Sequence, residues 1–181
     1  MARLYVPVAN RVVTGHREKY IEQLKRLDNP FVMVYIDRKY DPEVQAKNLA
    51  ELKENLAYFE AQGFDTGVWV QAFGFGNPLE GREAELTKGY TRITDLNGRV
   101  AGDAMCPLNE KYMEFYLTLL RGIAEAGAKR IMLDDTQDAV IELSRRYNEA
   151  EFIGCNGQLQ GDRVSLDPVG GWRFGAVILR K

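Results

Sequence analysis

Four short apolar runs divide the chain, and each run finishes in or near a polar side chain that can bind or react. Continuous apolar runs are typical of parallel strands that are buried on both faces. The last run, KRIMLDD, ends in the adjacent carboxylates Asp134 and Asp135. Since ligands bind at the carboxyl ends of such strands, the pattern predicts a functional edge there, although strand ends also simply become polar. The runs are Leu4–Asn10, Phe31–Asp37, Gly67–Phe73 and Lys129–Asp135.

Helical segments alternate with these runs and carry apolar residues at spacings of three and four. Asp41, followed by Pro42, is a helix start, and Gly63 and Gly127 are helix ends. Strands that alternate with helices imply right-handed βαβ units and a parallel sheet. We therefore expect an α/β fold of four βα units over residues 1–150. The expected helices are His16–Leu27, Asp41–Gln62, Leu108–Ala126 and Ala139–Tyr147.

Residues 151–181 break this alternation. Short β-like runs are separated there by Gly, Asn and Pro, which predicts antiparallel strands joined by turns. We expect either a piece of β-sandwich or a ribbon at the edge of the sheet. Its expected buried residues are Val164, Leu166, Phe174, Val177 and Leu179.

Composition narrows the function classes. A chain of 181 residues fits one domain, and a net charge of -2 gives no reason to expect nucleic acid as a partner. No apolar stretch approaches the roughly 20 residues of a membrane helix, and the first residues lack a secretory signal, so a cytoplasmic protein is expected. Cys106 and Cys155 form neither a metal motif nor a disulfide framework. With His16 as the only histidine, acid–base chemistry is left mainly to carboxylates and tyrosines, and no cofactor or metal is expected.

The segment from Gly74 to Met105 is long for a connection in a compact domain, and long connections are usually functional. Within it, YTRITDLNGRVAGD predicts a hairpin with Asn97-Gly98 at the turn. Its opening AFGFGNP lacks the third glycine of a dinucleotide fingerprint, because Leu79 stands at that position.

Aromatic residues accompany polar ones around this segment, a combination that suits sugars, whose CH faces stack on rings while their hydroxyls need donors and acceptors. The alternative is that Trp69 and Phe73 are core residues, and that Phe75 and Tyr90 serve only to pack the loop. The candidate substrate-binding residues are Asn10, Trp69, Gln71, Phe75, Tyr90 and Arg92.

Glycoside hydrolysis uses two carboxylates that flank the scissile bond. Asp134 and Asp135 are neighbours on a strand and point to opposite faces, so they do not form that pair with each other. Asp37 and Asp103 are the candidates for the second carboxylate. A metal site built from Asp37, Asp134 and Asp135 is a further reading, without a spacing motif to support it.

The stretch FDTGVWVQAFGFGNP…YTRITDLNGRVAGDAMCPLNEKY…GIAEAGAKRIMLDD resembles the first half of a TIM-barrel glycoside hydrolase catalytic domain. The resemblance covers about Arg3–Thr136, and the final GDRVSLDPVGGWRFGAVILRK is similar to the closing strands of the β-sandwich that often follows such barrels. It implies a catalytic carboxylate at Asp134, with Asp135 as the alternate.

A full barrel has eight βα units and about 250 residues, whereas only four units precede the tail here. Most such families carry the second catalytic carboxylate on a later strand. Two alternatives to a hydrolase therefore stand: a non-catalytic or degenerate carbohydrate-binding domain, and a half barrel that self-associates as a homodimer.

Overall fold

The computed structural model describes residues 3–74, 78–94 and 100–134, together with strand segments at 151–152, 157–160, 163–166 and 177–178. Its centre is a sheet in which four parallel strands lie in the order β1 (Leu4–Ala9), β2 (Pro30–Ile36), β3 (Asp65–Gln71) and β6 (Ile131–Asp134). The expected α/β class with a parallel sheet is confirmed.

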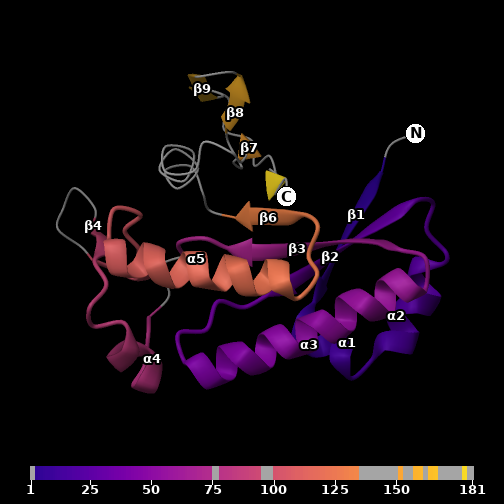
Figure 1. The fold of residues 1–181 in the computed structure, drawn as a ribbon, viewed down its shortest axis with the longest axis horizontal. Coiled ribbons are helices and arrows are strands. Elements are labelled where there is room, and N and C mark those ends of the chain that lie inside the picture. Colours follow the sequence, from indigo (N-terminus) through magenta and orange to yellow (C-terminus); the bar gives the residue numbers. More distant parts are fainter. Residues whose placement is uncertain are drawn as a thin grey trace.

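One face of this sheet forms the core with the helices (Figure 1). Val8, Val34, Val68 and Ile131 stand in register across the four strands and belong to the same buried cluster as helix residues. Strands that follow one another in space as in sequence, joined by right-handed crossovers, place their helices on one side. The helices are α1 (Asn10–Thr14), α2 (Arg17–Leu24), α3 (Pro42–Ala61) and α5 (Glu110–Glu125).

Helices α3 and α5 begin where their capping residues stand. Asp41 Oδ1 accepts from Glu43 N at 3.0 Å, and Pro42 occupies the first helical position, where its missing N–H costs nothing. Asn109 Oδ1 accepts from Tyr112 N at 2.9 Å, so α5 starts at Glu110, two residues later than expected.

Two short helices escaped the sequence analysis. Asn10 was expected to end a strand, but β1 stops at Ala9 and Asn10 is the first residue of α1. Helix α4 (Gly81–Leu86) lies within the long connection, where Glu83 Oε2 accepts from Tyr40 N at 3.1 Å and Arg82 pairs with Asp41 at 2.8 Å. At five and six residues, both helices are too short to give a clear hydrophobic period.

The remaining strands are antiparallel. Strands β4 (Arg92–Thr94) and β5 (Val100–Met105) form the predicted hairpin, whose expected turn at Asn97-Gly98 lies outside the described residues. In the tail, β8 (Gly157–Gln160) pairs with β9 (Arg163–Leu166), and β10 (Val177–Ile178) joins β6 to β7 (Glu151–Phe152) at the sheet's end. The expected helix at Ala139–Tyr147 and the side chains of the tail lie outside the described part.

Candidate active site

Two rows of side chains cross the carboxyl ends of β2, β3 and β6. Gln71 is in register with Asp134, and Ile36 with Val70, so Asp37 falls level with Gln71. The preceding row on the same face contains Tyr35, Trp69 and Met132, which are paired in register. Because side chains alternate along a strand, both rows lie on the face opposite the helices. The structure therefore brings together the predicted residues Asp37, Trp69, Gln71 and Asp134.

Trp69 holds the Asp134 carboxylate. The indole Nε1 donates to Asp134 Oδ2 at 3.2 Å, and the carboxylate residue is only 6% exposed. The indole is itself braced by the ring of Tyr35, whose centroid lies 5.3 Å away in an edge-on arrangement. Trp69 is half-buried. Its indole positions a carboxylate, which is a role distinct from that of a core residue.

Tyr35 is the residue of this site that sequence analysis missed. Burial, followed by the negative charge of Asp37 and a hydrogen bond to it, raises the Tyr35 pKa to about 12. The hydroxyl is therefore protonated at neutral pH and donates to the Asp37 carboxylate. The period-two alternation that places residue 35 on the face of residue 37 was the available signal.

The spacing of Asp37 and Asp134 follows from the sheet. β3 lies between their strands, and neighbouring strands are about 4.8 Å apart, so the two backbone positions are separated by about 10 Å. Gln71 stands between them in the same row.

Asn10 lies on the helix side of the sheet. Its Oδ1 accepts from Asn55 Nδ2 at 2.8 Å, and its Nδ2 donates to the Asn48 carbonyl at 3.0 Å. Asn48 in turn donates to the Asp37 carbonyl at 3.2 Å. Asn10 is thus 2% exposed within a network that joins α1, α3 and the end of β2, and it is not brought to the carboxylate row.

Tyr90 and Arg92 also lie apart from that row. Tyr90 packs against the helix-side core, with its ring centroid 5.8 Å from Tyr40 and 6.1 Å from Phe115. Arg92 Nη2 donates to Thr87 Oγ1 at 3.5 Å. Phe75 and Asp135 lie outside the described residues.

Arg38 ties the long connection to the sheet just behind Asp37. Its Nη1 donates to the Ala72 carbonyl at 2.7 Å and to Tyr112 Oη at 2.9 Å, and its Nη2 donates to the Asp103 carbonyl at 3.1 Å. The Asp103 carboxylate lies 3.6 Å from the same nitrogen, and the Arg38 side chain is 3% exposed. Asp103, one of the two candidates for a second carboxylate, is therefore engaged in a buried ion pair.

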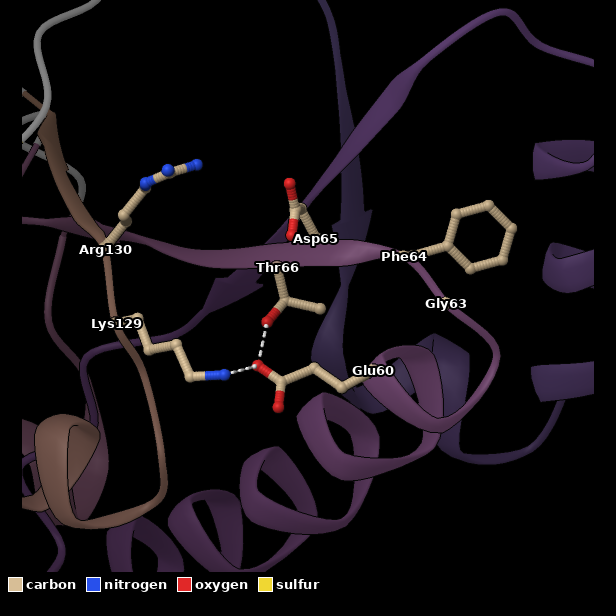
Figure 2. Close-up of a pocket in the computed structure, with 7 residues that line it drawn as sticks. All are labelled: Glu60, Gly63, Phe64, Asp65, Thr66, Lys129 and Arg130. Carbon is tan, nitrogen blue, oxygen red and sulfur yellow. Dashed lines mark hydrogen bonds and ion pairs between the residues drawn. The ribbon is translucent and has the colours of Figure 1, made fainter.

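A polar hollow of about 460 Å³ lies at the other end of the strands (Figure 2). Glu60 Oε1 accepts there from Thr66 Oγ1 and from Lys129 Nζ, each at 3.0 Å. Asp65 pairs with Arg3. Glu60 and Asp65, the two carboxylates that line the hollow, are therefore both paired with cations.

The described residues contain no group of three or more His, Cys, Asp and Glu side chains placed to hold a metal ion. None of the helices among them is long and apolar enough to cross a membrane.

Comparison with protein-family models, with curated proteins and with solved structures finds no match for this chain. What the chain does is therefore inferred from the carboxyl edge itself. The features available there are two carboxylates in one row, an amide between them, and two aromatic side chains in the row beneath.

Proposed function

We propose that the chain acts on carbohydrate at this edge, with Asp37 and Asp134 as the carboxylate pair that hydrolyses an O-glycosidic bond. The observation that carries the proposal is their common row, with Gln71 between them and with Tyr35 and Trp69 beneath. Trp69 offers a ring face or edge to the sugar, and Gln71 offers both a donor and an acceptor to its hydroxyls.

The backbone positions of Asp37 and Asp134 lie about 10 Å apart, which suits an inverting mechanism better than a retaining one. Inverting carboxylates stand roughly 6.5–9.5 Å apart to leave room for a water, against about 5 Å in retaining enzymes. Asp134, nearly enclosed, would protonate the leaving oxygen. Asp37, whose charged form accepts from Tyr35, would take a proton from the water as that water attacks the anomeric carbon on the opposite face.

The half-barrel origin belongs to the same proposal. Its supports are the resemblance over Arg3–Thr136, the consecutive order of the parallel strands, and the gathering of the helices on one face. In a complete barrel the opposite face is the interior, and active sites lie at the carboxyl ends of the strands. A homodimer in which two copies supply eight strands is the corresponding proposal for assembly, and light scattering on a size-exclusion peak tests it.

The test is hydrolysis of a panel of 4-nitrophenyl glycosides by the wild-type chain and by Asp134→Asn, Asp37→Asn and Asp28→Asn. Asp28 is an exposed carboxylate remote from the row, so Asp28→Asn is the matched control. Loss of a general acid or base costs about 10²–10⁴-fold in rate, and we expect this loss in the first two variants only.

Activity that persists unchanged in Asp134→Asn would overturn the catalytic assignment. Sugar binding measured by calorimetry without any turnover would instead support a carbohydrate-binding domain. The Trp69–Asp134 hydrogen bond favours that second candidate, because it leaves one oxygen of the carboxylate already engaged.

A further inference from the structure

We propose a second binding site, separate from the carboxylate row, in the groove between α3 and α5, for a small aromatic molecule that carries a carboxylate. The groove has a volume of about 570 Å³, within the roughly 300–1,000 Å³ of ligand pockets. Tyr90 closes it from the long connection, and the segment after β2 contributes Lys39 and Tyr40.

Three aromatic rings give the groove its shape. The Tyr40 centroid lies 5.0 Å from that of Phe115 and 5.8 Å from that of Tyr90, and Tyr90 lies 6.1 Å from Phe115. Leu49 and Leu119 complete the apolar wall from the two helices. Planar rings prefer offset or edge-on contacts at these distances, so an aromatic guest adds to an existing cluster.

The charges at the groove favour an anion. Lys39 and Lys111 line it and form no salt bridge with the described residues, while Glu114 is its one carboxylate. Two ammonium groups beside an apolar ring site match a ring that bears one negative charge.

The groove also contains polar groups whose bonding is incomplete. Gln45 Oε1 accepts from Lys39 N at 2.7 Å, which fixes the amide and leaves Nε2 without a hydrogen-bond partner. Tyr40 Oη also lacks one, and the two residues are only 7% and 6% exposed. Unmet buried donors destabilise the empty groove. A carboxylate that reaches Gln45 Nε2 would give this donor a partner.

The probe is phenylacetate, with phenylacetamide as the neutral molecule of nearly the same shape. Binding is followed by protein-observed nuclear magnetic resonance on the wild-type chain. We expect saturable shifts at Tyr90 and Phe115, and weaker binding of the amide. Lys111→Ala should weaken phenylacetate binding about two- to fivefold, the range of an exposed ion pair. Lys47→Ala, on the exposed surface of α3 outside the groove, should not.

A variant that fills the groove tests whether the ligand binds inside it and is not merely attracted by the surface charge. Ala46 is exposed and lines the groove, so Ala46→Trp should block binding, whereas Ala61→Trp at the end of α3 should leave it intact. Asp134→Asn should bind as the wild type does, because the site does not depend on the carboxylate row. Absence of saturable binding up to about 10 mM, a range in which even weak ligands saturate, would overturn the proposal. Equal affinity for the amide would also overturn it, as would capture of an aromatic peptide but not of phenylacetate.

Discussion

The Trp69 indole donates its Nε1 hydrogen to Asp134 Oδ2 across neighbouring parallel strands, at 3.2 Å. The residue of β3 that lies opposite Asp134 in the ladder is Gln71, and Trp69 lies two residues before it. The bond therefore runs diagonally from the lower row to the upper one and couples the aromatic row to the carboxylate row. A substitution of the Trp69 ring should consequently change the environment of the Asp134 carboxylate.

Trp69→Phe tests this coupling, because it keeps an aromatic ring and removes the donor. We expect a loss of about 1.5 kcal/mol in unfolding free energy, the upper end for a typical intramolecular hydrogen bond. Urea unfolding of Trp69→Phe, Asp134→Ala and the double variant measures the pairwise term. Additivity within about 0.3–0.5 kcal/mol would show that the two side chains act independently.

We predict that the chain loses stability at high pH because of the raised pKa of Tyr35. Its pKa is about 12 in the folded chain against the usual 10, so the protonated hydroxyl is favoured by folding. The resulting stabilisation is complete below about pH 10, where the phenol is protonated in both states. It is lost as the pH rises from 10 toward 12, because the unfolded chain then releases the proton first.

The measurement is urea unfolding of the wild type and Tyr35→Phe between pH 8 and 11.5. The gap in unfolding free energy between them should be constant up to about pH 10 and should then narrow. Tyr5→Phe, which removes an exposed hydroxyl on β1, is the matched control. A gap that stays constant throughout would show that burial and Asp37 do not raise the pKa of Tyr35 in the folded chain.

Much of the fold is local in its causes, which is why sequence patterns predicted it. The Asp41-Pro42 cap sets the start of α3, and Gly63 and Gly127 follow α3 and α5 with φ of 85° and 105°. The apolar runs predicted the parallel strands, and register then aligned Asp37, Gln71 and Asp134.

What sequence patterns did not predict depends on long-range contacts. Asn10 was assigned to the sugar site because it was expected to end a strand, yet its side chain bonds to Asn55, 45 residues away, in the helix layer. Tyr90 was grouped with Trp69 because both are aromatic and near one loop, but Tyr40 and Phe115 hold it on the other side of the sheet. No local period encodes which face a loop residue joins.

We predict a large loss of unfolding free energy when the charge of Arg38 is removed. Arg38→Met keeps the aliphatic stem but leaves Asp103 charged and without its partner, and it leaves the Ala72 carbonyl without that donor. Breaking one side of a buried ion pair costs about 3–5 kcal/mol. Urea unfolding should show this loss, and Arg38→Met combined with Asp103→Leu should recover part of it. A double variant no more stable than Arg38→Met would contradict the assigned ion pair.

We predict that no side chain is tolerated at Gly74, where the long connection passes close to Arg38 and Asp103. Its φ is +96°, and a Cβ there would lie 2.5 Å from the Asp103 carbonyl oxygen and 2.7 Å from Arg38 Nη2. The backbone conformation alone costs a residue other than glycine about 1–2 kcal/mol, and the contacts with Asp103 and Arg38 add to this. Gly74→Ala should therefore lower the midpoint of urea unfolding clearly. Gly15→Ala, where φ is -88° and a Cβ meets nothing within 4 Å, should be neutral or slightly stabilising. Equal midpoints for the two variants would mean that the connection does not approach Arg38 as closely as the structure places it.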